Sequence, residues 1–200
     1  MKNNTFKHIS DEELVRLYVE SQRNSYFEEL YDRYSDKVYR KCVSFVKNQA
    51  QAEDYTHDIF LRLVLKIGSF KENSKFSTWL YSITYNYCMD QLRIAKRHGE
   101  VAMADNFDFE EEVDDKELLE IQSHDLNKAL DKISAEEKAI LLMKYQDDFS
   151  IKEIADTFNL TESAVKMRLM RTKEKVKKLY LDNIVIFFII LLKILLFWKE

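Results

Sequence analysis

The sequence predicts an all-α fold: two small helical bundles joined by an acidic linker, the second containing a helix-turn-helix, plus a C-terminal hydrophobic helix. The 200 residues include two glycines and no proline, so the chain lacks the turn residues that sheet-rich folds need. Apolar residues recur at spacings of three and four along most of the chain, which is the period of an amphipathic helix. Hydrophobic and charged contents of 46% and 33% are typical of a folded protein.

The periodicity divides the chain into four parts. It is strong in the first part, weak in the second, and returns in the third, whereas the fourth is apolar on all sides. We therefore expect a first bundle over residues 10–98, a linker over 99–123, a second bundle over 124–181 and a hydrophobic tail over 184–198. Helices are predicted near 10–22, 25–47, 50–67, 76–98, 124–133, 134–146, 150–158 and 162–181.

Helix ends can be read from local signals. Three serines are each followed three residues later by a glutamate, which is the pattern of a capping box: Ser10–Glu13, Ser134–Glu137 and Ser150–Glu153. In this motif each side chain accepts a hydrogen bond from an otherwise unpaired backbone N–H. Gly68 and Gly99 each follow a helical pattern, which predicts left-handed C-caps at both.

Charge is distributed unevenly along the chain. The net charge is −4, but residues 98–125 contain one basic and eleven acidic side chains, while residues 160–180 contain seven basic and two acidic ones. The slightly acidic total therefore does not argue against nucleic-acid binding, because the local field decides which partner is attracted.

The most specific local pattern is a helix-turn-helix over residues 150–178. A short amphipathic helix is followed by Asn159 and Leu160, and Thr161 can cap the next helix, whose apolar stripe includes Val165 and Leu169. The opposite face is basic and suits the DNA major groove. The alternative is an ordinary basic helix with a solvated face. The candidate DNA-contacting residues are Ser163, Lys166, Met167, Arg168, Met170 and Arg171.

These residues resemble a known family. SIKEIADTFNLTESAVKMRLMRTKEKVKKL resembles the promoter −35-binding helix-turn-helix of bacterial RNA polymerase sigma factors. Upstream, FEELYDRYSDKVYR, AEDYTHDIFLRLVLKI and FSTWLYSITYNYCMDQLR resemble, in order, the other domain of that family, called region 2. The short acidic linker and the lack of further domains resemble the extracytoplasmic-function class, also called group IV. The resemblance covers roughly residues 10–181.

The resemblance implies a polymerase-binding helix at residues 52–67, which docks on the coiled coil of the β′ subunit. The implied contact residues are Asp54, Asp58, Phe60 and Arg62. Two simpler explanations remain for the charges on this helix. They could form a solvated face with an Asp58–Arg62 pair, or, with His57, a metal site, although the absence of further ligands argues against a metal.

The resemblance also implies that residues 71–79 recognise and open the −10 element. Opening requires that a base leave the duplex and be held by stacking and polar contacts. The candidate residues are Asn73, Ser74, Lys75 and Phe76 in the loop and Arg93, Lys96 and Arg97 on the helix after it. For Trp79 and Tyr85 a role in core packing is equally consistent with the sequence.

The tail over residues 184–198 departs from the family pattern. Its only polar residue is Lys193, and fifteen helical residues reach about 22 Å, less than the roughly 30 Å of a bilayer core. Three interpretations stay open: a short membrane anchor, a docking segment for another protein, or an extension without a role.

The patterns and the resemblance together lead to an expected function. The chain is expected to be a sigma factor that binds core RNA polymerase, through the β′ coiled coil and the β flap, and promoter DNA. An anti-sigma factor and a membrane contact through residues 184–198 are further potential partners. No catalytic constellation, metal site or cofactor is expected. The alternatives are a stand-alone helix-turn-helix regulator and a membrane-associated adaptor.

The cellular compartment is predicted from the cysteines and the N-terminus. Cys42 and Cys88 lie inside apolar patterns, and two cysteines without an export signal indicate a reducing compartment. The expected location is the cytoplasm, with the tail as a candidate for membrane association.

Overall fold

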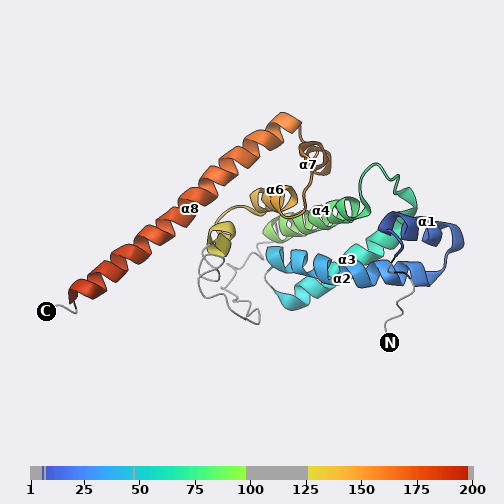
Figure 1. Ribbon diagram of the computed structural model, residues 1–200, viewed down its shortest axis with the longest axis horizontal. Coiled ribbons are helices and arrows are strands. Elements are labelled where there is room, and N and C mark those ends of the chain that lie inside the picture. Colours follow the sequence, from blue (N-terminus) through green and yellow to red (C-terminus); the bar gives the residue numbers. More distant parts are fainter. Residues whose placement is uncertain (1–5, 7, 47, 98–125, 198–200) are drawn as a thin grey trace. The chain divides into compact units, whose positions relative to one another are not determined.

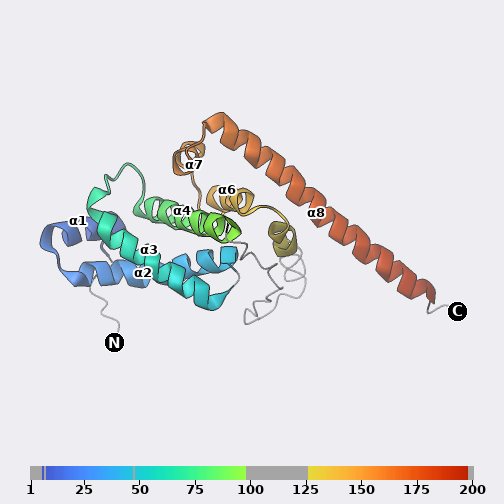
Figure 2. The same ribbon diagram turned by 180° about the vertical axis from the view of Figure 1, so that it is seen from behind.

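The computed structural model describes residues 6, 8–46, 48–97 and 126–197, with side chains described as far as Leu181. Within these ranges all regular structure is helical, which confirms the predicted all-α fold. The chain forms two compact units, Met1–Asp108 and Phe109–Glu200, which Figures 1 and 2 show from opposite sides. The predicted acidic linker, residues 99–123, lies outside the described residues.

The first unit is a helical bundle. Its helices are α1 (Asp11–Ser21), α2 (Asn24–Val46), α3 (Gln49–Lys66) and α4 (Phe76–Arg97), with a short 3₁₀ helix, η2 (Ile67–Ser69), after α3. These bounds lie within a residue or so of the predicted ones. α2 packs against α1, α3 and α4, so it is the central helix of the bundle.

The apolar stripes of these helices form one core. Leu30, Val38, Ile59, Leu63 and Leu80 are fully buried. Complete burial of each such side chain stabilises the fold by about 1.5–3 kcal/mol. The predicted burial of both cysteines is confirmed: Cys42 of α2 and Cys88 of α4 lie side by side as free thiols with their Sγ atoms 3.9 Å apart.

Polar contacts fix α1 on the bundle. Arg33 of α2 donates to Asp11 at 2.7 Å and to the carbonyl oxygens of Ile9 and Phe6 at 2.9 and 2.7 Å. Tyr34 donates its hydroxyl hydrogen to the other carboxylate oxygen of Asp11 at 2.5 Å. Burial and this hydrogen bond raise the pKa of the Tyr34 hydroxyl well above its usual range, so it remains a donor at all ordinary pH values.

The second unit is smaller. It contains a helical stretch at 126–131, α6 (Ala135–Tyr145), α7 (Ile151–Phe158) and α8 (Glu162–Phe197). α8 packs against α6 and α7. The core of the unit is built from fully or almost fully buried side chains of all three helices and the α6–α7 turn: Ala139, Ile140, Met143, Phe149, Ile154 and Val165.

The caps follow the prediction in part. Ser134 with Glu137, and Ser150 with Glu153, form complete capping boxes. Ser10 caps α1 by accepting from the Glu13 N–H at 3.2 Å, which is one half of the motif. The prediction for Gly68 was wrong, because this residue lies in η2 without a positive φ. Gln22 and Asn159 take the left-handed caps instead, and Gly99 lies outside the described residues.

The C-terminal segment also differs from the expectation of a separate helix. The backbone of α8 continues without a break from the helix-turn-helix to Phe197. The side chains of residues 182–197, and the whole of Trp198, lie outside the described residues, so the interpretation of the tail stays a prediction. Among the residues that were described in full, none of the helices has the length and apolarity required to cross a membrane.

The capping boxes generate a prediction for stability. Ser150→Ala and Ser134→Ala should each destabilise the second unit by about 1 kcal/mol, because the backbone N–H of the glutamate loses its acceptor. Ser10→Ala serves as the comparison in the first unit. Urea denaturation followed by circular dichroism measures all three. Equal stability of Ser150→Ala and the unmodified chain would contradict the assigned role of the cap.

Candidate nucleic-acid interface

The helix-turn-helix is formed by α7 and the first part of α8. Asn159 adopts a left-handed conformation, and the Leu160 N–H donates to the Ala155 carbonyl at 2.9 Å, which makes the turn tight. Thr161 caps α8 as predicted, since its hydroxyl oxygen accepts from the Ala164 N–H at 3.2 Å. The start of α8 is therefore fixed relative to α7 by backbone geometry as well as by packing.

Two faces of α8 differ sharply. Val165, Leu169 and Thr172 are buried on the side of α8 that packs on this unit, which confirms the first part of the predicted stripe, whereas the predicted members Val176 and Leu179 are only half-buried. The other face is exposed over two turns of helix and combines positive charge with apolar side chains that are about half exposed: Ser163, Lys166, Met167, Met170 and Arg171. A helix whose only role was to pack inside the bundle would not require exposed apolar side chains among positive charges. The face has the size and charge that suit a major groove.

Arg168 differs from the other candidates. Its guanidinium is only partly exposed and forms an ion pair with Glu136 of α6. Nearby, Lys175 donates to Glu137 at 2.9 Å. These two pairs join the first half of α8 to the start of α6. A DNA contact by Arg168 would have to compete with Glu136, so its structural role is better supported here than the expected role in reading DNA.

The loop before α4 presents polar side chains. Lys71, Asn73 and Lys75 are exposed, and Ser74 is half-buried. Phe76 requires a correction. It is 0% exposed and packs edge-on against Tyr34 and Phe70 at centroid distances of 5.4 and 5.8 Å. Phe76 is the first residue of α4, and its ring lies inside the core, where it cannot stack on a base.

Two other aromatic residues of α4 were left open by the sequence. Tyr85 is fully buried and contacts Phe45, so it belongs to the core. Trp79 is half-buried against Phe70, with ring centroids 5.2 Å apart. Further along α4, the candidates Arg93, Lys96 and Arg97 are exposed, and Arg93 forms a 3.2 Å ion pair with Asp90.

The exposed face of α3 carries three of the four predicted polymerase contacts. Asp54, Asp58 and Arg62 are exposed. Asp58 accepts from the Tyr87 hydroxyl of α4 at 2.5 Å, and the Arg62 guanidinium lies 4.5 Å from the centre of the same ring. Burial and the Asp58 carboxylate raise the pKa of the Tyr87 hydroxyl.

Phe60 is the exception on α3. It is 4% exposed and packs against Tyr31 with ring centroids 4.6 Å apart, so it supports the surface from beneath. Sequence reasoning missed two apolar residues beside these charges: Leu61 is 53% and Leu65 is 85% exposed. Their signal is an i, i+4 apolar pair that lies off the buried stripe of α3.

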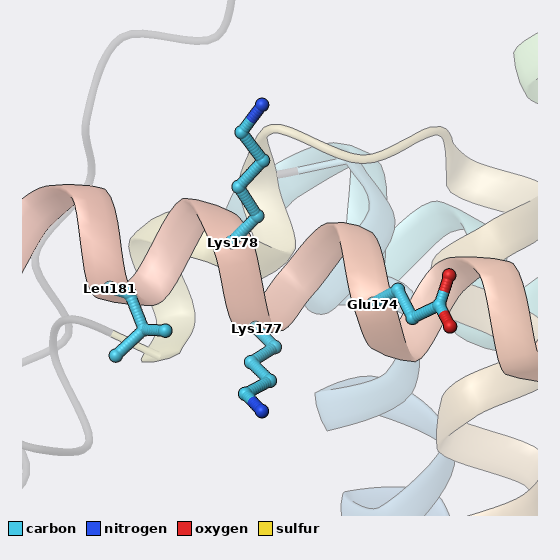
Figure 3. A pocket seen from close by; sticks show the side chains of 4 residues that line it. All are labelled: Glu174, Lys177, Lys178 and Leu181. Carbon is cyan, nitrogen blue, oxygen red and sulfur yellow. The ribbon is translucent and has the colours of Figure 1, made fainter.

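Two features of the described residues bear on ligand binding. In the part of the chain that the structure describes, no three His, Cys, Asp or Glu residues are grouped so as to hold a metal ion, and this includes Asp54, His57 and Asp58. A shallow hollow on α8 is lined only by Glu174, Lys177, Lys178 and Leu181 (Figure 3). Lys177 and Lys178 extend from opposite sides of this one helix, so they do not converge on a ligand.

Comparison with known proteins decides the family. Residues 30–98 match the family described as Sigma-70 region 2, and residues 123–176 match the family described as Sigma-70, region 4. The ECF RNA polymerase sigma factor SigW of Bacillus subtilis is 30% identical over 164 residues, which span 76% of this chain and 87% of SigW. The chain belongs to the extracytoplasmic-function sigma factors. It directs promoter-specific transcription initiation.

Other relatives agree. This sigma factor is 29% identical to BldN of Streptomyces coelicolor over 161 residues, which span 78% of this chain and 61% of BldN. Its fold is similar to that of the sigma factor RpoE from Bartonella quintana, with a TM-score of 0.63, 20% identity, and coverage of 76% of this chain and 95% of that one. For CnrH the TM-score is 0.61 and the identity is 19%, and the match covers 86% of this chain and 97% of CnrH. The match to Sigma-70 region 2 over residues 30–98 argues against the alternative of a stand-alone helix-turn-helix regulator, because such a regulator does not require this region.

The contact between α8 and α6 generates a pH prediction. Burial alone would raise the pKa of Glu137, but hydrogen bonds from Lys175 and the Ser134 backbone outweigh it and lower the pKa below its ordinary 4.5. A lowered carboxyl pKa contributes stability above the unfolded-state value, and this is lost as the pH falls through the folded-state value. Glu137→Gln should therefore reduce stability at pH 7 and weaken the acid-induced loss below about pH 4.5.

Chemical denaturation at pH 7 and pH 3.5 tests this prediction. Glu136→Gln is the matched control, because its partner Arg168 is also on α8 but Glu136 has no role in the capping box. If Glu137→Gln loses as much stability on acidification as the unmodified chain, the assignment is wrong.

Proposed function

We propose that the two units divide the work of initiation. Residues 10–98 bind core polymerase through α3 and recognise and open the −10 element through the loop before α4. Residues 124–181 bind the −35 element through the exposed face of α8. The observation that carries this proposal is the contrast along α8 between a buried apolar stripe and an exposed face of Ser163, Lys166, Met167, Met170 and Arg171.

The proposed −35 contact combines charged and apolar side chains. Lys166 and Arg171 supply positive charge for phosphates and, in the case of Arg171, a planar fork that can pair with guanine. Met167 and Met170, half exposed on the same face, suit apolar contact with thymine methyl groups. Phosphate contacts position the helix, whereas base-edge contacts select the sequence.

The −10 contact is assigned to the five-residue loop 71–75. Asn73, Ser74 and Lys75 offer donors and acceptors to a base held outside the duplex, and Lys96 and Arg97 at the end of α4 offer charge to the backbone. Phe76 is not part of this contact because its ring is in the core. Trp79, half-buried next to Phe70, is the aromatic residue on α4 that keeps an accessible surface near the loop.

The polymerase contact is assigned to the outer face of α3. Leu61 and Leu65 supply apolar area, and Asp54, Asp58 and Arg62 surround it with charge. An apolar centre with a charged rim is the usual anatomy of a protein–protein interface. The partner is the β′ coiled coil, and the second unit would contact the β flap.

An anti-sigma factor is proposed as a regulator. The solved structures with a similar fold contain the anti-sigma factor NepR and the cytosolic domain of CnrY as partners. For this sigma factor, a partner that covers Leu61 and Leu65 would compete with polymerase, because both proteins would need the same apolar area.

Reconstituted transcription tests the division of work. Core polymerase with this protein should initiate at discrete sites on genomic DNA, and mapping the starts identifies the promoters. The combination Lys166→Ala with Arg171→Ala should lower initiation about tenfold or more while core affinity stays unchanged, because each lost base or phosphate contact costs about 1–3 kcal/mol. Lys177→Ala, an exposed residue three turns further along α8, is the matched control.

Two further variants complete the same experiment. Asn73→Ala with Lys75→Ala should lower initiation without affecting core affinity. Leu65→Ser should weaken core binding by about tenfold, with Val19→Ser on α1 as the exposed apolar control. Loss of core affinity in the α8 variant, or full activity of the Leu65 variant, would refute the division.

Membrane association is proposed for the tail. Residues 184–198 are apolar apart from Lys193, and four exposed lysines precede them on α8: Lys173, Lys175, Lys177 and Lys178. Basic residues on the cytoplasmic side of an apolar segment favour attachment there. The protein would then be cytoplasmic and held at the membrane surface through its last helix.

Cell fractionation tests the tail. The full chain should be recovered with membranes, and a chain that ends at residue 183 should be recovered in the soluble fraction and still initiate transcription in vitro. A full chain that stays soluble when its polymerase partner is present would refute attachment through this segment.

A further inference from the structure

The start of α4 lacks a cap of its own. The Lys75 carbonyl accepts the first helical hydrogen bond, from Trp79 at 3.1 Å, so Lys75 occupies the N-cap position. A lysine side chain has no acceptor, and the first turn of α4 contains no acidic residue. The Lys75 side chain therefore cannot accept from the first backbone N–H groups of this helix, and no acidic side chain in the first turn faces the positive end of the helix dipole.

α1 supplies the missing acceptor. Glu12 accepts a hydrogen bond from the Phe76 backbone N–H at 2.8 Å, across 64 residues of sequence. The carboxylate is partly buried, so solvent screens it less than a surface charge. It also places a negative charge at the positive end of α4. The contact is made at the first residue of α4, directly after the loop 71–75.

The same helix reaches the first half of the loop. Arg16 lies one turn after Glu12 and pairs with Glu72 at 3.3 Å, where Glu72 has a left-handed backbone with φ of 54°. Both side chains are about half exposed, so this pair contributes little energy by itself. The half-buried ring of Phe70 packs edge-on against the buried ring of Phe76 at the base of the loop, between these two contacts. The loop is thus held at its base and on one side while its polar tip stays exposed.

We propose that Glu12 is a positioning residue for −10 recognition. It touches no DNA; it presets the loop 71–75 in the free protein, so that Asn73, Ser74 and Lys75 do not have to be ordered when a base is captured. Preorganisation of this kind strengthens the capture step and sharpens selectivity, because a loose loop accommodates the wrong base more easily. The inference rests on the −10 role proposed for this loop.

Holoenzyme assembled from core polymerase and the full chain tests the inference on a mapped promoter and on a library of its single −10 substitutions. Glu12→Ala should lower initiation about tenfold, equivalent to about 1.4 kcal/mol, which is within the range for a lost helix cap. It should also flatten the preference among −10 bases while leaving core affinity unchanged. Glu12→Gln retains an acceptor oxygen and should stay within about twofold of the unmodified chain.

Controls separate positioning from folding. Glu20→Ala, an exposed glutamate of the same helix, should initiate normally. Glu12→Asp, whose carboxylate is one methylene shorter, carries the test if Glu12→Ala does not fold, and should show a smaller loss with the same flattened preference. Normal initiation by Glu12→Ala, a parallel loss of core affinity, or an equal loss on every −10 sequence would overturn the inference.

The loop variant distinguishes the two levels of the argument. If Asn73→Ala with Lys75→Ala impairs initiation and Glu12→Ala does not, the −10 role stands and the positioning role fails. If neither change affects initiation, the −10 role of the loop fails, and the inference falls with it.

Discussion

Packing around α2 is the interaction on which the first unit depends. Tyr34 alone contacts two other helices: it donates to Asp11 at the start of α1 and its ring contacts Phe76 and Tyr81 of α4. On its other side α2 packs against α3 through contacts such as Tyr31 with Phe60. Within this unit, the surfaces proposed for polymerase and for the −10 element are the outer face of α3 and the loop before α4, and α2 packs against both α3 and α4. Their geometry is therefore set by a core that contacts neither partner.

The second unit supports the exposed face of α8 with a smaller core. Its core is small, so the helix ends matter more, and α6 and α7 each begin with a complete capping box. α8 is held by a buried stripe on one side and by ion pairs to Glu136 and Glu137 of α6. A recognition helix needs such support, because a groove contact selects bases only when its side chains have defined positions. Arg168 and Lys175 supply this support and leave Lys166 and Arg171 exposed.

Burial separates the residues proposed to contact partners from those that support them in the core. Phe60 and Phe76 lie within the stretches that resemble functional parts of the family, and both are in the core. Leu61 and Leu65, which were not selected as contact residues from the sequence, lie on the surface. A match to a family motif therefore identifies a working element, while the role of each side chain depends on which face of the helix it occupies. The same distinction gives Glu12 its proposed importance, since its effect on the loop passes through a single backbone N–H.

Much of this protein could be predicted from its sequence. Periodicity located the helices within a residue or so because burial of one face imposes its spacing on the chain, and Ser134, Ser150 and Thr161 marked helix starts because capping is local. The family could be recognised from two sets of motifs. Contacts between distant segments could not be predicted: Glu12 with Phe76, Asp58 with Tyr87 and Arg168 with Glu136. Nor were the left-handed caps at Gln22 and Asn159 predicted from the sequence, although asparagine adopts this conformation more readily than most residues. Helix positions and N-caps depend on residues that are neighbours in the sequence, so the sequence alone determines them. The partner of a side chain on another helix is decided only when the tertiary fold brings the two helices together.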